Sequence, residues 1–176
     1  MELFTMTAEW EPPVKDLYTE AFPKKERKPW RMIKRQIRKG QTEALVLFET
    51  VVEAFVIATK SGDKVLIEYL AVHPSRRGLG VGTQLLEEIQ KRYASERLLL
   101  EIERVDVTMD RTDVRVKRLA FYENCGFRRT GMHLLVYGVP MELLVFRGGV
   151  TKEEYLGMYD MTVGKRLTKR FIKLEE

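Results

Sequence analysis

The sequence predicts a mixed α/β layer within a single domain. Three observations lead to this fold class. The apolar runs Ala44–Glu49 and Val52–Lys60 predict a β-hairpin. The run Val65–Val72 consists mainly of β-branched and aliphatic residues, which is typical of a buried strand. Directly after it, a glycine-rich turn leads into Leu79–Tyr93, where apolar residues recur at helical spacing.

The other elements are predicted in chain order around this unit. A first helix is expected over 14–21, after two prolines and before Pro23. A second is expected over 29–39, with a proline in its first turn and Gly40 at its C-terminal end. Further apolar runs predict strands over 98–103, 127–130 and 140–146, and apolar residues at helical spacing predict a helix over 114–124.

The glycine-rich turn predicts an anion site. Glycines at 78, 80 and 82 let backbone N–H groups approach a ligand closely, and the following helix directs its free N–H groups and positive dipole end to the same place. Phosphate and pyrophosphate are the usual ligands of such a turn. No Lys follows Gly82, and the third glycine is too close to the second, so neither the nucleoside-triphosphate loop nor the dinucleotide fingerprint fits.

The turn fits a third pattern, [QR]-x-x-G-x-[GA], and two further segments accompany it. The preceding strand ends in Tyr69–Pro74, and a later helix ends in Phe121–Phe127, of the form (F/L)-Y-E-x-x-G-F. Together these segments resemble the GCN5-related N-acetyltransferase (GNAT) family. The resemblance extends over residues 1 to about 147, so we expect an acetyltransferase domain over 1–147 and a helical C-terminal extension over 148–176.

The resemblance implies a fold and a cofactor site. The fold is a mostly antiparallel sheet, flanked by helices and splayed between its fourth and fifth strands. The acetyl donor is acetyl-CoA, and no metal is required. The backbone of Leu70, Ala71 and Val72 is expected to bind the pantetheine arm, with the Leu70 N–H as oxyanion donor. The pyrophosphate is expected on the loop formed by Arg77, Gly78, Leu79, Gly80, Val81, Gly82 and Thr83.

The resemblance also implies catalytic groups. Tyr122 matches the tyrosine that protonates the departing thiolate; the alternative is an amphipathic core tyrosine. Glu68 interrupts an apolar strand and is a candidate general base, since a carboxylate there is costly unless it lines a cleft or is paired. Glu101 and Glu103 share one face of the next strand and are further candidates. Ion pairs with nearby arginines are the alternative for all three acids.

Composition and charge narrow the choice of partners. The net charge of +5 is concentrated in two basic clusters, one over 24–39 and one over 165–173. Apolar residues at helical spacing in the first cluster favour a solvated helix face over a nucleic-acid surface. No segment is apolar enough for a membrane span. The single Cys125 and the two histidines predict neither a disulfide nor a metal site and fit a cytoplasmic location.

The sequence therefore predicts an acetyl-CoA-dependent N-acetyltransferase that transfers acetyl to a primary amine of a small molecule or peptide. An alternative of another class is a cofactor-binding sensor, or a nucleic-acid-binding module that uses the basic helix. Apolar residues in the extension, among them Tyr155 and Tyr159, suggest a surface that packs on the domain or forms a homodimer.

Overall fold

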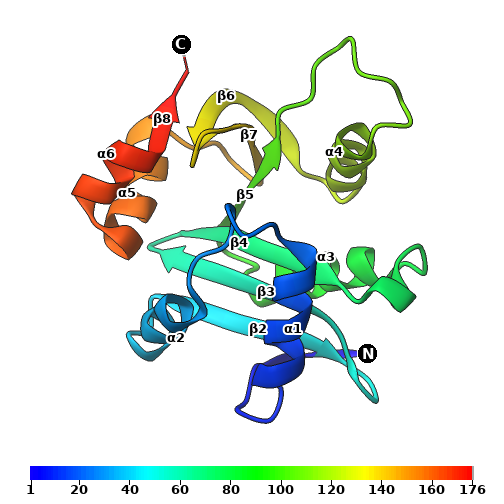
Figure 1. Ribbon diagram of the computed structural model, residues 1–176. Helices are drawn as coiled ribbons and strands as arrows, with labels where there is room; N and C mark the ends of the chain where they lie inside the picture. The colour runs from blue at the N-terminus through cyan, green and yellow to red at the C-terminus, as the bar shows by residue number, and fades with distance from the viewer. Residues whose placement is uncertain (176) are drawn as a thin grey trace. The chain divides into compact units, whose positions relative to one another are not determined.

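The structure is a computed structural model that describes residues 1–175. The chain forms two compact units (Figure 1). Unit 1 consists of Met1–Gly62 and Ile67–Ala94, and unit 2 of Asp63–Leu66 and the chain from Ser95 on. The boundary crosses the fourth strand, so that most of this strand belongs to unit 1.

Unit 1 contains four strands and three α-helices. Their order along the chain is β1 (Glu2–Thr5), α1 (Glu11–Ala21), α2 (Trp30–Arg38), β2 (Thr42–Phe48), β3 (Val52–Ser61), β4 (Lys64–Val72) and α3 (Val81–Arg92). The strands lie in the order β1-β2-β3-β4, and β2 pairs antiparallel with both β1 and β3. The hairpin of β2 and β3 confirms the sequence-based prediction.

The strands of unit 1 bury residues on both faces. Phe55 of β3 and Tyr69 of β4 lie in one cluster with Val14 of α1 and Ile33 of α2. These two helices therefore cover one face of the sheet. Residues of opposite parity, such as Val56, point to the other face, where α3 contacts β1 and β3.

As far as residue 175, unit 2 contains four further strands and three helices. They are β5 (Arg97–Glu103), α4 (Val114–Asn124), β6 (Arg128–Val136), β7 (Val139–Phe146), α5 (Lys152–Val163), α6 (Lys165–Phe171) and β8 (Ile172–Leu174). The order is β5-β7-β6-β8, with antiparallel pairs throughout. The beginning of β4 runs parallel to β5, and the Arg97 N–H donates to the Asp63 carbonyl at 2.8 Å. The mixed α/β fold class is thus confirmed.

The C-terminal segment is part of the core of unit 2. Tyr155 and Met158 of α5 are buried with Leu99 of β5 and Leu143 of β7. A capping box at Thr151 and Glu154 begins α5. The strand β8 then pairs with β6 and covers its outer edge. The expected boundary between residues 147 and 148 does not coincide with the two units and stays a prediction.

Several element boundaries differ from the sequence-based expectation. The short strands β1 and β8 were not expected, because three or four residues give no clear alternation of apolar and polar side chains. The strand β6 continues to Val136 because an irregularity between Arg129 and His133 interrupts its pairing pattern without ending it. The helix α3 begins at Val81, not Leu79, because Gly80 adopts a left-handed conformation.

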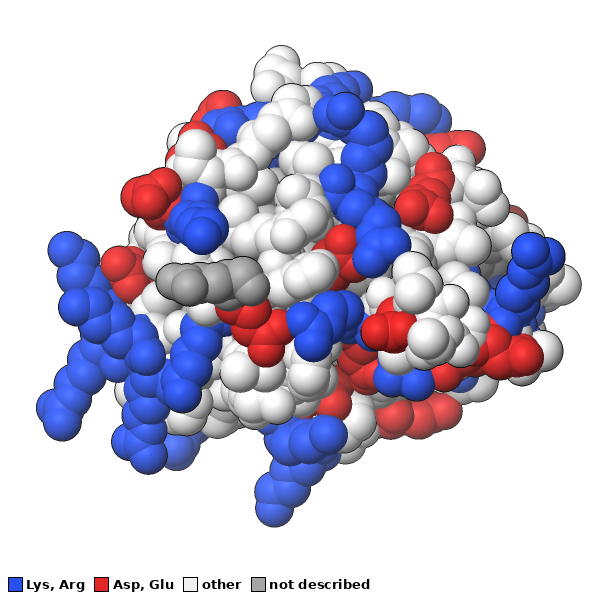
Figure 2. Space-filling view, turned by 90° about the horizontal axis from the view of Figure 1, so that it is seen from above, with Lys and Arg blue, Asp and Glu red and all other residues white. Residues whose placement is uncertain are grey.

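The basic stretches lie on exposed helix faces. In α2, Ile33 is buried while Arg31, Arg35 and Arg38 are exposed, as the apolar spacing predicts. In α6 the exposed cations are Lys165, Arg166, Lys169 and Arg170. Lys and Arg side chains also project from the left edge of the surface in Figure 2. Across residues 1–175, every helix falls short of the length and apolar character that a bilayer crossing requires.

The glycine of the second signature has a structural role that a substitution can test. Gly126 has φ +86°, and a Cβ there would lie 3.0 Å from the Phe146 ring. Gly126→Ala is expected to lower the free energy of unfolding by about 2 kcal/mol, from left-handed backbone strain plus displacement of this ring. Urea unfolding measures the change.

Gly131→Ala is the matched control. Gly131 also has positive φ, at +74°, but no atom lies within 4 Å of its Cβ position. The control should lose only the backbone contribution, about 1 kcal/mol. Equal losses in both variants would mean that the contact with Phe146 contributes nothing.

Candidate active site

The glycine-rich loop of unit 1 is built from the end of β4 and the start of α3. Pro74 cannot continue the strand ladder, and residues Pro74–Arg76 form one 3₁₀ turn. The ring nitrogen Nδ1 of His73 accepts from the Ser75 N–H at 3.4 Å, and the Arg76 N–H donates to the His73 carbonyl at 2.9 Å. These bonds turn the chain sharply out of the sheet before the loop begins.

Two glycines then set the path of the loop. Gly78 has φ +76° and Gly80 has φ +80°, a region that other residues enter only at a cost. Open space surrounds the Cβ position of each, so the backbone conformation, not crowding, is what requires glycine here. Gly80 is also the N-terminal cap of α3, while Gly82 lies inside the first turn of that helix.

The loop presents a row of free backbone donors. Within residues 1–175, the N–H groups of 78–83 donate no hydrogen bond to another residue. The N–H of Arg77, also expected in this row, donates instead to the Pro74 carbonyl over a long 3.4 Å. Free N–H groups at the positive end of a helix bind anions, so this arrangement fits a phosphate or pyrophosphate.

The strand residues expected to contact a bound arm lie just before this loop. Tyr69 and Ala71 are buried against α1 and α2. Leu70 and Val72 alternate with them, point to the opposite face and are half-buried. The Val72 carbonyl accepts from Nε of Arg77 at 3.2 Å. The roles predicted for the Leu70, Ala71 and Val72 backbone stay predictions.

The candidate base Glu68 is an ion-pair partner in this structure. Nζ of Lys28 lies 2.5 Å from Oε2 of Glu68, and both side chains are only 5% exposed. Thr59 donates to the other oxygen, Oε1, at 2.6 Å. Both carboxylate oxygens are therefore engaged. The cationic partner is a lysine from the loop between α1 and α2, whereas the sequence-based alternative was a nearby arginine.

The same loop is held by two tyrosines. The Tyr18 hydroxyl donates to the Lys28 carbonyl at 3.0 Å. The Tyr69 hydroxyl accepts from the Lys28 N–H and donates to the Glu26 carbonyl, both at 3.0 Å. With the Glu68 contact, these bonds fix the segment between α1 and α2 onto β4.

The candidate acid Tyr122 lies on α4 in unit 2. Its ring packs against Phe121 and, edge-on, against Phe127 of the same signature, with centroids 5.1 and 5.9 Å away. Burial raises the pKa of its phenol to about 12, and the nearby Arg118 lowers it only in part. Among residues 1–175 the hydroxyl has no hydrogen-bond partner. The phenol is therefore protonated at neutral pH, and its role as proton donor stays a prediction.

Glu101 of β5 is held by two tyrosine hydroxyls. Oε1 of Glu101 accepts from the hydroxyls of Tyr155 at 2.7 Å and Tyr159 at 2.6 Å. Both tyrosines come from α5, which the family resemblance does not cover. Two of the arginines near these acids pair with other carboxylates, Arg104 with Glu175 and Arg115 with Asp113.

One residue near the loop was missed by sequence reasoning. Glu53 lies in β3 and is buried, and it pairs with Arg76 of the 3₁₀ turn. The signal was present, because a carboxylate interrupts the apolar run of β3 just as Glu68 interrupts β4. Across residues 1–175, no three His, Cys, Asp or Glu side chains form a group suited to a metal ion.

Comparison with solved structures gives the same fold. A Bacteroides thetaiotaomicron protein described as a GNAT-family acetyltransferase superposes with a TM-score of 0.80 at 19% identity, covering 93% of this chain and 99% of that one. A Bacillus subtilis acetyltransferase in complex with CoA gives 0.61 at 17% identity, covering 84% and 98%.

The ribosomal-protein-S18-alanine N-acetyltransferase of Escherichia coli also gives a TM-score of 0.61 at 17% identity, with 86% and 96% covered. Comparison with curated protein sequences gives no match. The model of the acetyltransferase (GNAT) domain matches residues 41–129, half of the chain, including β4, the loop and the Tyr122 signature. The chain therefore belongs to the GNAT acetyltransferase family.

Proposed function

We propose that this protein transfers an acetyl group from acetyl-CoA to a primary amine. The observation that carries the proposal is the row of unpartnered N–H groups over 78–83, shaped by the left-handed Gly78 and Gly80. These groups are suited to the pyrophosphate of coenzyme A. Acetyl-CoA, when bound, supplies the activated thioester.

The reaction forms a C–N bond and breaks a C–S bond. The amine loses a proton, the carbonyl oxygen gains negative charge as the nitrogen attacks, and the thiolate gains a proton as it leaves. The Leu70 N–H is our candidate donor to the carbonyl oxygen, because a backbone N–H held in a strand is preorganised for that charge. Tyr122 is our candidate donor to the thiolate, because its free hydroxyl is protonated at neutral pH.

Glu68 is the sequence-based candidate for the group that accepts the amine proton. The contacts of Glu68 with Lys28 and Thr59 favour a role in fixing the loop between α1 and α2 over its predicted role as base. Loss of the proton to water, with no side chain as direct acceptor, is consistent with these contacts. The acceptor is a small-molecule or peptide amine.

Release of the coenzyme A thiol tests the proposal. Wild-type protein is mixed with acetyl-CoA and a panel of amines: a polyamine, an aminoglycoside, a peptide with a free N-terminus and a lysine peptide. Turnover with any of these, above the rate of acetyl-CoA hydrolysis, supports the proposal. Binding of acetyl-CoA without turnover on the whole panel would favour the sensor, and absence of binding would reject both.

A further inference from the structure

Glu53 is an unusual residue for its position. It lies in β3 between apolar neighbours and is 1% exposed. Burying a carboxylate costs free energy unless a cation and hydrogen bonds compensate it. The residues that contact Glu53 therefore indicate which part of the chain its buried carboxylate serves to hold in place.

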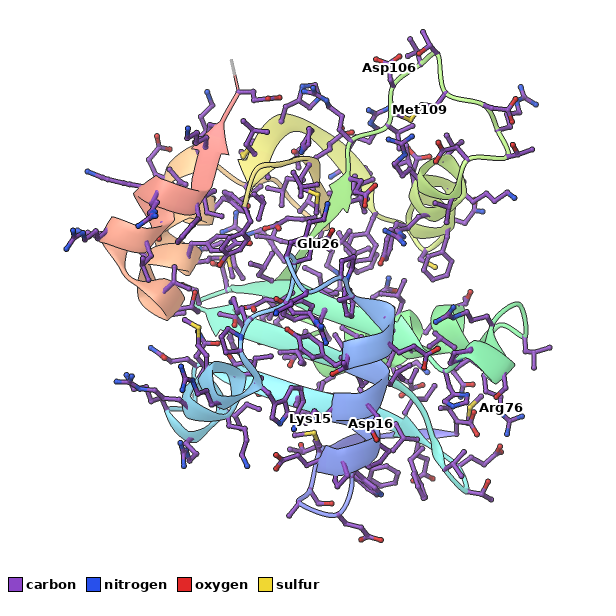
Figure 3. The ribbon with its side chains drawn as sticks, viewed as in Figure 1. Lys15, Asp16, Glu26, Arg76, Asp106 and Met109 are labelled. Atoms are coloured by element: carbon purple, nitrogen blue, oxygen red, sulfur yellow. The ribbon has the colours of Figure 1, made fainter. Side chains whose placement is uncertain are left out.

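That partner comes from the turn before the glycine-rich loop. Nη2 of Arg76 donates to Oε1 of Glu53 at 3.0 Å, and Nε of Arg76 lies 2.6 Å from Oε2. The backbone carbonyl of Glu53 also accepts from the His73 N–H at 2.8 Å. One residue of β3 therefore holds both ends of the turn His73–Arg76. Figure 3 labels Arg76, which comes just before α3 in the chain.

The turn determines where the loop begins. Arg76 is followed directly by Arg77 and Gly78, and the row of free N–H groups starts at Gly78. The two glycines give the loop a bent path but supply no side chain to anchor it. The loop is anchored at its flanks, by α3 on one side and by the Glu53–Arg76 pair and the Arg77–Val72 hydrogen bond on the other.

The pair also fixes the charge pattern of the loop. Glu53 compensates the Arg76 guanidinium, which is 40% exposed. Within residues 1–175, the Arg77 guanidinium donates a hydrogen bond to the Val72 carbonyl and forms no ion pair with a carboxylate.

We propose that Glu53 is a positioning residue for the coenzyme A pyrophosphate: by holding Arg76 and His73, it fixes the loop in the conformation that directs its N–H groups at the anion. The inference rests on the proposed function. Glu53 lies outside the loop motif and sets cofactor affinity without touching the cofactor.

The test separates the two halves of the cofactor. Isothermal titration measures the binding of coenzyme A, of adenosine 3′-phosphate 5′-diphosphate and of pantetheine to wild type and Glu53→Gln. We expect the affinity for the first two to fall by on the order of tenfold, the scale of losing one charge-assisted hydrogen bond. The affinity for pantetheine should stay unchanged, because it carries no phosphate.

Glu43→Gln is the matched control. Glu43 of β2 accepts from Arg92 and Tyr93 at the far end of α3, so this variant also removes a strand-to-helix carboxylate from unit 1. It should leave all three affinities unchanged. Arg76→Gln, at a partly exposed position, serves as a second disruption in case Glu53→Gln does not fold, and should reproduce the selective loss.

The outcomes are distinct. A loss confined to the two phosphate-bearing ligands supports the inference, and an equal loss for pantetheine overturns it in favour of general destabilisation. Wild-type affinity in both Glu53→Gln and Arg76→Gln also overturns it. Failure of wild type to bind coenzyme A rejects the proposed function and this inference with it.

Discussion

Replacing Gly80 with glutamate is expected to weaken the binding of coenzyme A by about 100-fold or more, since like charges juxtaposed at a binding site cost several kcal/mol. Gly80 lies in the middle of the free N–H row and caps α3. A carboxylate there places a negative charge where the pyrophosphate is proposed to bind. The open space around the Cβ position lets the side chain fit without distorting the neighbouring elements.

A matched variant separates charge at the site from backbone strain. Gly62→Glu introduces the same side chain at another positive-φ glycine with open space, φ +59°, in the turn at the opposite end of β4. Both variants should lose about 1–2 kcal/mol of stability to the left-handed backbone. Only Gly80→Glu should lose cofactor affinity, measured by titration. Similar affinities in the two variants would mean that the loop is not the anion site.

The loop could be predicted from sequence because it is local. A buried strand, a proline, alternating glycines and a helical repeat lie within about thirty consecutive residues, and each restricts the backbone by itself. The boundaries of β2, β3 and β4 agree within a few residues for the same reason. The conformation of Gly80 is an exception, since the predicted helix over 79–93 includes this residue, whereas its left-handed φ makes it the cap that precedes α3.

The contacts of the acids could not be predicted, because they join residues distant in sequence. Glu68 pairs with Lys28, forty positions earlier. Glu101 accepts from two tyrosines of α5, more than fifty positions later. A strand pattern marks such a carboxylate as costly, but it does not say which cation or hydroxyl compensates it. That choice depends on how the helices pack on each face.

Replacing Tyr122 with phenylalanine is expected to lower kcat by about 100-fold, within the usual contribution of general acid catalysis. The substitution keeps the ring contacts with Phe121 and Phe127, so stability and coenzyme A affinity should stay close to wild type. Tyr93→Phe is the control. Its hydroxyl already donates to Glu43, so its loss should affect stability and not turnover. Equal kcat in Tyr122→Phe and wild type would remove Tyr122 from the mechanism.

The pH dependence of this loss identifies the proton donor. Burial raises the pKa of the Tyr122 phenol to about 12, and an acid is protonated below its pKa. The Tyr122 phenol therefore stays protonated from about pH 6 to about pH 10. An ordinary tyrosine, in contrast, is partly ionised at about pH 10. The ratio of wild-type to Tyr122→Phe rates should be constant across this range. A ratio that falls as the pH rises would show that the group lost in the variant ionises within it, which a phenol held protonated by burial does not do.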